Sequence, residues 1–489
     1  MRIRTCRSRS AAGDWMAKRV VVALSFGGVV LGGFDRRAVA ADAAATASIA
    51  APATPRALHP LIVNGRATSS YPSTGALLLY DDATASNLYG LCSGTLIGCR
   101  TFLTAAHCVC PENATDAASC ERAGTADPAT LRVFLQHGGV YRAASVAIPT
   151  DYSFGERSDL ALITLSEAVT GIAPSAINTT RRPDIGTAGT IVGFGTTAAG
   201  RSSADDAGIK RVGTVATAEC PSDIPDATHV CWAFSGSDAN TCDGDSGGPL
   251  FIDFGAGPVV AGVTSGGHSF DCLAPDTAFD SDVFVNRSWI SATAGADLGT
   301  ESCDLPETGS TLTTLFAGSG DVSAGSPEAQ LQFEVSEGAT VLRVGLNAQL
   351  VSGSAFSGDV NDDDLFIRFG SAPTVTAFDC ADTNPTPFGF CTITAPHPGT
   401  WHVLVRRNQG AGAFQVTATT FAAASIPSCA GDCNHDGAVT VDELLTAVNI
   451  ALNGDPAACP SCDANGDGIV TVDELVTAVG FALGGCPTG

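Results

Sequence analysis

Eighteen cysteines in a chain of 489 residues constrain the fold of this protein more than any other feature of its sequence. A cysteine count this high is typical of proteins that leave the cell, because disulfides persist in oxidising compartments. Cys6 lies in the N-terminal leader, so its removal leaves an odd number of cysteines. We therefore expect a disulfide-stapled protein with one thiol that is either free or paired between chains.

The leader supports export. The apolar run at residues 20–31 follows Lys18 and Arg19 and precedes the small residues at 38–40. This order is typical of a secretory signal peptide, which we assign to residues 1–40. A single membrane anchor is the alternative, but the run is shorter than the roughly 20 residues that a membrane-spanning helix needs. We expect a secreted or cell-surface protein with no membrane span after signal removal.

Composition excludes some partners. The formal net charge is −25, so nucleic acid and anionic lipid would be repelled. No Lys or Arg follows Arg407, whereas Asp and Glu continue, which places an acidic module at the C-terminus.

The composition and the residue pattern of the chain change several times along its length. Short β-type runs broken by Gly, Pro and Asp predict a double β-barrel, with one helix at "DVFVNRSWIS" near its end. Later period-2 patterns predict a β-sandwich. We expect a mainly β protein with a small α-helical module at its C-terminus. The predicted boundaries are a signal peptide at 1–40, a propeptide at 41–61, a double barrel at 62–296, a linker at 297–305, a sandwich at 306–421 and a calcium-binding repeat at 422–489.

Three separated stretches carry side chains with complementary chemistry. "TAAHC" contains His107, "SDLALITL" contains Asp159 and "GDSGGP" contains Ser246. A serine hydroxyl is a weak nucleophile at neutral pH, so it needs an imidazole to take its proton and a buried carboxylate to hold that imidazole in the right tautomer. Taken singly, His107 fits a core histidine and Asp159 fits a turn or cap. Together they predict a site for nucleophilic catalysis.

In their order His, Asp, Ser, these stretches resemble the trypsin and chymotrypsin-like serine proteases over about residues 62–296. The resemblance implies a double β-barrel that hydrolyses protein or peptide substrates. It assigns Ser246 as the nucleophile, His107 as general base and then acid, and Asp159 as the residue that orients the imidazole. No cofactor is expected for this chemistry.

Glycines are expected beside Ser246, because side chains there would crowd the approach of backbone N–H groups to an oxyanion. The resemblance makes Gly244 and Ser246 the donors of this oxyanion hole. It also implies a zymogen: cleavage frees the ammonium of Ile62, which pairs with the buried carboxylate of Asp245 and holds the oxyanion loop. "LIVNG" therefore marks the activation bond between Leu61 and Ile62.

Two departures from trypsin concern specificity. Leu61 precedes the activation bond where Arg or Lys is usual, and Asn240 takes the place of the Asp at the base of the specificity pocket. An Arg or Lys head group beside Asn240 would stay unpaired, so strict trypsin specificity is not expected. Small residues are expected to form the pocket walls, and they are Ser265, Gly266, Gly267 and Ala278. Our hypothesis is a Leu-like residue before the scissile bond (the P1 position) and self-activation at Leu61; cleavage by another protease is the alternative.

The resemblance also implies three disulfides in this domain, which are Cys92–Cys108, Cys220–Cys231 and Cys242–Cys272. Four further cysteines match no common pair and are left unassigned, namely Cys99, Cys110, Cys120 and Cys303. Disulfides are the first interpretation for them, and a metal site around Cys110 is the alternative.

The predicted sandwich resembles the bacterial pre-peptidase C-terminal domain, in "DDDLFIRFGSAPT", "FDCADT", "GFCTITAPHPGTWHVLVR" and "FQVTAT". The resemblance suggests bacterial export, a Cys380–Cys391 disulfide, and a role in secretion or surface binding. An acidic segment precedes "LFIRF", and it is either a calcium site or a solvated loop; its members are Asp359, Asn361, Asp362 and Asp363.

The last sixty or so residues contain a repeat at an offset of 31 residues. Each copy has the acidic spacing of a calcium loop, with Glu at its twelfth position, followed by apolar residues at helical spacing. The expected ligands are Asp432, Asn434, Asp436, Thr440 and Glu443 in the first loop, and Asp463, Asn465, Asp467, Thr471 and Glu474 in the second.

The pair resembles a dockerin, a module of two EF-hand-like calcium loops that binds a cohesin partner. It departs from dockerins in having Glu at the twelfth position and in its extra cysteines, for which a "CPSC" zinc knuckle is a further alternative. A cohesin-like or cell-surface partner is therefore an expectation. The competing function class for the whole chain is a protease-like adhesion protein without activity, attached through its C-terminal modules.

Overall fold

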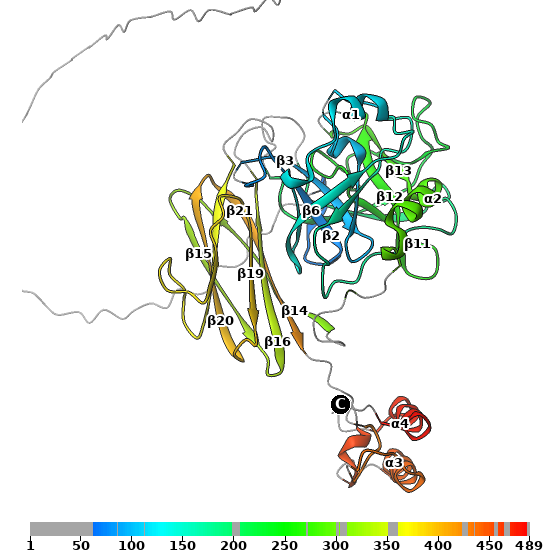
Figure 1. Cartoon of the computed structure of the whole chain (residues 1–489), viewed down its shortest axis with the longest axis vertical. Coiled ribbons are helices and arrows are strands. Elements are labelled where there is room, and N and C mark those ends of the chain that lie inside the picture. Colours follow the sequence, from blue (N-terminus) through cyan, green and yellow to red (C-terminus); the bar gives the residue numbers. More distant parts are fainter. Residues whose placement is uncertain are drawn as a thin grey trace, which may run out of the picture. The chain divides into compact units, whose positions relative to one another are not determined.

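The computed structural model describes twelve segments of the chain (Figure 1), which are residues 62–85, 87–111, 113–197, 206–269, 272–299, 303, 311–350, 360–422, 429–434, 436–453, 458–463 and 470–486. The predicted signal peptide, the propeptide and Leu61 lie outside these segments, as do Asp359, Asn465 and Asp467. None of the described helices is long and apolar enough to span a membrane.

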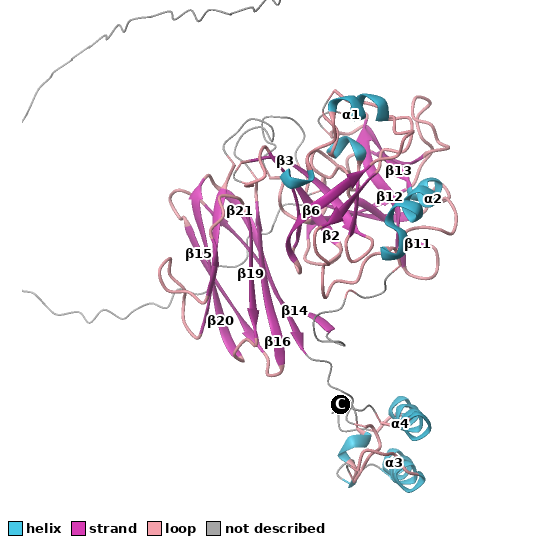
Figure 2. Ribbon diagram, viewed as in Figure 1, coloured by secondary structure: helices cyan, strands magenta, loops and turns pink. Residues whose placement is uncertain are grey.

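Six antiparallel strands form a closed barrel in the order β2-β3-β4-β7-β6-β5 (Figure 2). The strands are β2 Thr74–Tyr80, β3 Leu88–Leu96, β4 Thr101–Thr104, β5 Leu131–Leu135, β6 Gly139–Ala147 and β7 Ala161–Leu165. The barrel interior is filled by aliphatic and aromatic side chains such as Leu77, Phe102 and Ile163, all of them fully buried. The first predicted barrel is thereby confirmed.

A seven-stranded sheet follows, in the order β1-β9-β8-β11-β12-β13-β10. The strands are β1 Arg66–Ala67, β8 Ala188–Gly193, β9 Arg211–Ala216, β10 His229–Phe234, β11 Pro249–Asp253, β12 Pro258–Gly267 and β13 Asp276–Asp282. Just beyond β9, Ala218 donates a backbone hydrogen bond of 2.7 Å to Cys231 in β10. This bridge joins β9 to the far end of the sheet and curls the sheet toward a second barrel.

Short helices cover the ends of these sheets. They are η1 Ala106–Cys108, α1 Ala117–Ala123, η2 Pro128–Thr130, α2 Val283–Ala294 and η3 Gly295–Asp297. The helix predicted at "DVFVNRSWIS" is confirmed as α2, and its N-cap residue Asp282 accepts a hydrogen bond of 2.8 Å from the Phe284 amide. Such a cap satisfies backbone donors that the first turn leaves unpaired.

Two four-stranded antiparallel sheets make the sandwich, in the orders β14-β21-β16-β19 and β15-β20-β17-β18. The strands are β14 Thr311–Val322, β15 Glu328–Val335, β16 Ala339–Ala348, β17 Asp362–Phe369, β18 Cys380–Asp382, β19 Phe388–Thr394, β20 Gly399–Gln409 and β21 Gly412–Ala422. The alternating residues that predicted this fold, including Leu346, Leu365 and Val403, form its core.

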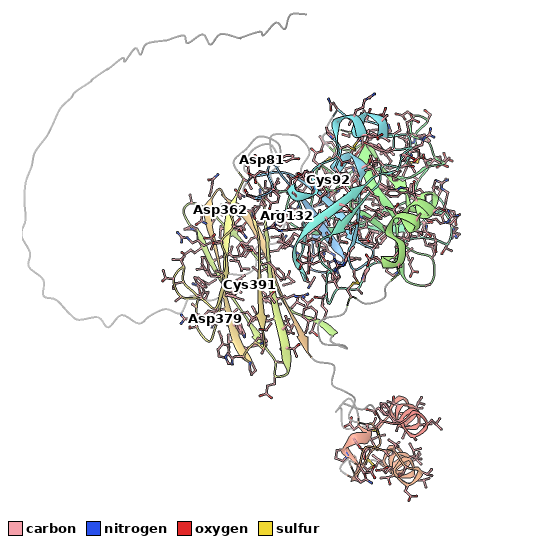
Figure 3. The ribbon with its side chains drawn as sticks, in the orientation of Figure 1. Asp81, Cys92, Arg132, Asp362, Asp379 and Cys391 are labelled. Carbon is pink, nitrogen blue, oxygen red and sulfur yellow. A yellow bond between two sulfur atoms is a disulfide. The ribbon has the colours of Figure 1, made fainter. Side chains whose placement is uncertain are left out.

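The described part of the acidic segment, residues 361–363, does not form a solvated loop. Asp363 and Asn361 are fully or almost fully buried. Two nitrogens of the Arg407 guanidinium each lie 2.6 Å from an oxygen of Asp363, in a buried bidentate ion pair. Figure 3 shows Asp362 and Asp379 toward opposite ends of the sandwich. Asp363 therefore has a structural partner that the sequence did not predict.

The sandwich packs against the first barrel through an apolar contact. Every residue of β2 is buried: Leu77 faces the barrel core, whereas Leu78 belongs to a second cluster with Leu350 and Phe388 of the sandwich. The rings of Phe134 and Phe388 lie 5.1 Å apart. The continuous apolar run of β2 is explained by burial on both of its faces.

Buried hydrogen bonds accompany this contact. The Gln415 side-chain oxygen accepts from the Lys210 amide at 2.8 Å and from Asn347 Nδ2 at 2.7 Å. His137 Nδ1 lies 2.7 Å from Thr419 Oγ1. Buried polar groups are costly unless they are paired, so this network specifies how the two surfaces meet.

Eight disulfides are formed among the residues that the structure describes. They include the pairs implied by the two resemblances, which are Cys92–Cys108, Cys220–Cys231, Cys242–Cys272 and Cys380–Cys391. The unassigned cysteines form Cys99–Cys303 and Cys110–Cys120, which removes the metal alternative at Cys110. In the tail, Cys429–Cys486 and Cys433–Cys459 leave Cys462 as a buried free thiol, so "CPSC" retains one thiol.

The tail contains two helices, α3 Val441–Asn453 and α4 Val472–Gly484, with η5 Pro460–Cys462 between them. Both helices lie where the repeat predicted them. Their apolar residues are less buried than the helical spacing suggested, since Val448, Leu452, Val479 and Leu483 are exposed.

Candidate active site

His107 and Asp159 form the centre of the site. His107 lies in η1, and Asp159 lies just before β7 in the same barrel. His107 Nδ1 is 2.7 Å from Asp159 Oδ2, and the His107 amide donates to Asp159 Oδ1 at 2.9 Å. The Ser265 hydroxyl also donates to Oδ2, at 2.6 Å. With both oxygens engaged, the fully buried carboxylate fixes the ring and directs Nε2 away from it.

Charge coupling sets the protonation of this pair. Burial alone would lower the pKa of His107, but the Asp159 charge and hydrogen bond raise it above its ordinary value. Burial would raise the pKa of Asp159, whereas the His107 charge and the hydrogen bonds from His107 and Ser265 lower it below its ordinary value. The carboxylate thus stays ionised and favours an imidazolium next to it.

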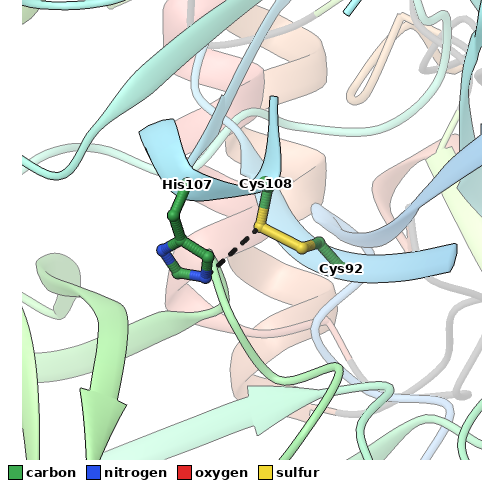
Figure 4. Close-up of side chains that lie close together, drawn as sticks. All are labelled: Cys92, His107 and Cys108. Carbon is green, nitrogen blue, oxygen red and sulfur yellow. Dashed lines mark hydrogen bonds between the residues drawn. A yellow bond between two sulfur atoms is a disulfide. The ribbon is translucent and has the colours of Figure 1, made fainter. Parts of the chain in front are cut away.

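The chain around Ser246 is held against the same histidine. The Ser93 amide donates to Ser246 O at 2.8 Å, and the Gly247 amide donates to Thr264 O at 2.8 Å. Cys108 Sγ lies 3.7 Å from Ser246 O and 3.9 Å from His107 Nε2. Figure 4 shows the His107 ring turned so that Nε2 faces the Cys92–Cys108 disulfide. The structure therefore brings together the neighbourhoods of all three predicted residues.

Backbone geometry at the serine turn requires glycine. Gly244 has φ +93° and Gly247 has φ +81°, a region that L side chains rarely adopt. A Cβ at Gly247 would lie 2.5 Å from Ser93 O. Within the described part of the chain, neither the Gly244 amide nor the Ser246 amide donates to an acceptor. These two N–H groups are available to an oxyanion.

Asp245 is buried beside this turn. Its carboxylate accepts from the Gly195 amide at 2.8 Å and from the Cys242 amide at 3.0 Å. Burial raises the pKa of Asp245 to about 7, although these amides and the nearby Arg211 charge oppose the shift. Arg211 is fully buried and donates to Gly195 O at 2.6 Å. No motif in the sequence marks this guanidinium, so its place beside Asp245 was not predicted.

Ile62 lies in the core of the second barrel. It is fully buried in a cluster with Ile191 and Trp232. No hydrogen bond or ion pair joins it to Asp245 among the described residues. In the continuous chain the Ile62 nitrogen is a neutral amide, so the predicted ion pair requires cleavage.

The predicted pocket residues differ in the side chains and strands that they contact. Asn240 is fully buried: its Oδ1 accepts from Trp232 Nε1 at 3.1 Å, and its Nδ2 donates to Asp276 Oδ2 at 2.8 Å. The Ser265 hydroxyl donates to Asp159. Gly267 pairs with Ala278 across β12 and β13. Asp276 was not predicted.

An aromatic side chain next to the histidine was also missed. Phe154 is 41% exposed, and its ring packs edge-on against His107 with centroids 5.5 Å apart. A Cβ at Gly266 would lie 3.5 Å from Phe154. Phe154 thus offers an apolar surface between His107 and the strand that passes Ser246.

Known proteins are similar in sequence to the part of the chain that contains this site. The trypsin family model matches residues 62–290. Trypsin alpha-3 of Lucilia cuprina is 33% identical over 150 residues, which are 28% of this chain and 85% of that protein. The chain belongs to the trypsin family. Residues 62–290 are therefore a trypsin-like serine protease domain.

Other matches of this trypsin-family chain are more distant. Trypsin alpha-4 of Lucilia cuprina is 26% identical over 216 residues, covering 42% of this chain and 78% of that protein. The solved structure of mouse neuropsin, described as a serine protease expressed in the limbic system of the brain, matches at 23% identity and a TM-score of 0.36, covering 47% of this chain and 98% of the other. The model of the bacterial pre-peptidase C-terminal domain matches residues 331–407.

Proposed function

We propose that this trypsin-family protein is a secreted serine endopeptidase in which Ser246, His107 and Asp159 act as the catalytic triad. The observation that carries the proposal is the His107 ring, fixed at Nδ1 by Asp159 at 2.7 Å and facing the Ser246 segment through Cys108. Export is supported by the eight disulfides and by the leader sequence.

Each residue has a defined role in the proposed reaction. His107 Nε2 takes the hydroxyl proton as Ser246 Oγ attacks the scissile carbonyl, and the ionised Asp159 stabilises the imidazolium that forms. The Gly244 and Ser246 amides bind the developing oxyanion. His107 then protonates the leaving amine, which gives an acyl-enzyme, and a water activated by His107 hydrolyses the ester.

Reaction with a serine-directed fluorophosphonate probe tests this proposal, because only an activated serine is phosphonylated readily. The matured wild-type chain should be labelled at Ser246, whereas Ser246→Ala and His107→Ala should stay unlabelled. Absence of labelling in the matured wild type would favour the competing function, an inactive protease-like adhesion protein.

The zymogen proposal concerns Ile62 and Asp245. A buried carboxylate that lacks a cationic partner is destabilised, and the pKa of about 7 at Asp245 expresses that cost. Cleavage after Leu61 would create an ammonium at Ile62, whose side chain is already in the adjoining core. N-terminal sequencing of the secreted wild type and of Ser246→Ala tests this. Ile62 in both would indicate an external activator, Ile62 only in the wild type would indicate self-activation, and Ile62 in neither would contradict the proposed activation bond.

Calcium binding by the tail is a separate proposal. The oxygen donors of the first loop fit a hard cation, and the loop is already curved: Asp432 accepts from the Gly437 amide at 2.8 Å, and Gly437 has φ +87°. Glu443 reaches back to the Cys433 and Thr440 amides at 2.9 and 2.8 Å. In the second copy the Thr471 amide donates to Glu474 at 2.8 Å. Helix capping also uses this carboxylate, so calcium titration is the decisive measurement.

The tail is further proposed to dock a cohesin-like or cell-surface partner. Each helix exposes four apolar residues at matching positions of the repeat; they are Val441, Leu445, Val448 and Leu452 in α3, and Val472, Val476, Val479 and Leu483 in α4. Exposed apolar patches are typical of interaction sites. Binding of the secreted chain to its own cells, compared with a chain carrying Leu452→Glu and Leu483→Glu, tests this. Equal binding by both chains would contradict it.

A further inference from the structure

We propose that the sandwich of this trypsin-family protease positions the turn that carries the nucleophile, residues 243–247, which we call the oxyanion turn. The inference rests on the proposed function of Ser246 and adds a regulating element to that same site. The sandwich acts through two segments of the protease domain, residues 194–197 and residues 206–211.

The first segment is bound directly to the oxyanion turn. The Gly195 amide donates to Asp245 Oδ1 at 2.8 Å. The next amide along the chain, that of Thr196, donates to Asp243 O at 2.8 Å. Two successive amides of this segment therefore hold the oxyanion turn, and a displacement of the segment would remove both donors at once.

Phe194 joins this first segment to the sandwich. Its amide donates to the Ser93 hydroxyl at 2.9 Å, and the same hydroxyl donates to Gly244 O in the oxyanion turn at 2.8 Å. Its side chain is fully buried in the apolar cluster that also contains Leu350 and Phe388 of the sandwich. The backbone of Phe194 thus supports the turn, while its ring belongs to a core that the sandwich completes.

The second segment is hydrogen-bonded to the sandwich. The Leu350 amide donates to Ala207 O at 2.7 Å. Asn347 Nδ2 donates to Gly208 O at 2.8 Å, and Asn347 is fully buried. These bonds join consecutive carbonyl groups of the segment to the sandwich, so they fix the path of its backbone.

Two further features show that this contact is close. Gly208 has φ +103°, and a Cβ at this position would overlap Ala348 O of the sandwich. The Lys210 amide donates to the Gln415 side-chain oxygen at 2.8 Å, and Gln415 Nε2 donates back to Lys210 O at 3.3 Å. Only glycine permits the approach at 208, and Gln415 satisfies both backbone groups of residue 210.

The two segments are also bonded to each other. The Gly208 amide donates to Phe194 O at 2.7 Å. Arg211, which is fully buried at the end of the second segment, donates from Nη1 to Gly195 O at 2.6 Å. Because the Gly195 amide holds Asp245, the position of the second segment determines how well the carboxylate is held.

These contacts favour the assembled site. The oxyanion turn is costly to order, since it contains two glycines, which lose more conformational freedom than other residues, and the buried carboxylate of Asp245. Contacts that are made in one arrangement shift a conformational equilibrium toward it. Asn347 and Gln415 are therefore positioning residues for the reaction, and the mature enzyme keeps its sandwich.

The test compares the matured full-length wild type with Asn347→Leu and Gln415→Met, which remove hydrogen bonds to the second segment and keep side chains of similar size. The fluorophosphonate probe gives the rate of phosphonylation at Ser246, and one peptide that the wild type cleaves gives kcat and KM. Urea unfolding first establishes conditions in which each chain is folded. We expect the phosphonylation rate and kcat to fall about 10-fold with KM nearly constant, because the oxyanion is bound in the transition state.

Arg343→Met is the matched control. Arg343 is buried at the same contact and lies in β16 like Asn347, but its Nη1 donates to Thr170 O at 2.7 Å, in the chain that follows β7 of the first barrel. This variant should lower the free energy of unfolding and leave the phosphonylation rate and kcat unchanged. A general effect of a weakened contact would instead appear in all three variants.

The outcomes distinguish the inference from the function on which it rests. Unchanged phosphonylation and kcat in folded Asn347→Leu or Gln415→Met, or an equal loss in Arg343→Met, would overturn the inference and leave the proposed function standing. The two test variants lie in different strands, β16 and β21, so either one decides the question if the other does not fold. A wild type that the probe does not label would remove the proposed function.

Discussion

Ser265 and Asp159 are joined by a hydrogen bond of 2.6 Å between the two halves of the protease domain. Ser265 belongs to β12 of the second sheet, whereas Asp159 precedes β7 of the first barrel. The hydroxyl therefore fixes the carboxylate from the side opposite His107. We expect Ser265→Ala to lower kcat/KM by about 10- to 100-fold, since one hydrogen bond to a charged group contributes about 1.5–3 kcal/mol. Because the lost donor raises the pKa of Asp159, a pH–rate profile whose shape changes, with KM nearly constant, would separate this role from a general loss of stability.

Asp159→Asn should be more damaging than Ser265→Ala. An amide cannot stabilise the imidazolium and selects the wrong tautomer of His107, so kcat should fall by about 10⁴-fold. The pH dependence gives a second check. The Asp159 charge raises the pKa of His107, so the rate of the wild type should rise with pH through a value above the ordinary one for histidine, as the imidazole loses its proton. A variant that keeps more than a tenth of wild-type kcat would contradict the assignment of Asp159.

The free energy of unfolding of the uncut zymogen should fall as pH rises through the range in which the Asp245 carboxyl group loses its proton. Burial raises the pKa of Asp245 from 3.8 to about 7, so between these values the folded chain holds a proton that the unfolded chain has released. The free energy of unfolding therefore falls as pH rises from about 4 to about 7. Urea unfolding of the Ser246→Ala zymogen at pH 4, 5.5 and 7 measures this slope. The slope should become shallower in Ser246→Ala with Asp245→Asn, but it should not vanish, because burial also raises the pKa of Asp280 and Asp363. An equal slope in both chains would refute the contribution of Asp245.

Calcium titration should detect two ions per chain if both tail loops bind. Glu443→Gln removes the carboxylate that closes the first loop, and it should leave one ion bound. Asp442→Asn changes an exposed neighbour and should leave two. Isothermal titration calorimetry after chelation gives these stoichiometries directly. No heat of binding to the wild type, with unchanged melting after chelation, would mean that Glu443 only caps α3.

Gln415 belongs to the sandwich and takes part in its contact with the protease domain. Removing its side chain should lower the free energy of unfolding of the chain. Gln415→Ala leaves the buried Lys210 amide without its acceptor and Asn347 Nδ2 with only its bond to Gly208 O, which should cost about 1–3 kcal/mol. Gln330→Ala, an exposed change in the same sandwich, is the matched control. Urea unfolding followed by tryptophan fluorescence measures both. Equal stability of the two variants would show that the network does not contribute.

The sequence predicted those parts of the site that depend on local motifs. "TAAHC" and "GDSGGP" located His107 and Ser246, and the repeat located both tail helices, because spacing along the chain determines these features. Asp276 and Ser265 could not be assigned in this way. Their contacts depend on the register of β12 with β13, which shifts between Thr264 and Gly266 and turns Gly267 toward Asp276. The Asp363–Arg407 pair was missed for the same reason, since strand pairing joins residues 44 positions apart.

The Cys99–Cys303 disulfide determines where the protease could be released from its C-terminal modules. Cys303 is bonded to the first barrel, so a cut on its N-terminal side would open the backbone while the modules remained covalently tethered. Only a cut beyond Cys303 would remove the covalent link, and the packing of the sandwich against the first barrel would still hold the parts together. A protease domain released in this way would retain Cys303 at or near its new C-terminus. After a cut on the N-terminal side of Cys303, separation would also require reduction of the Cys99–Cys303 disulfide.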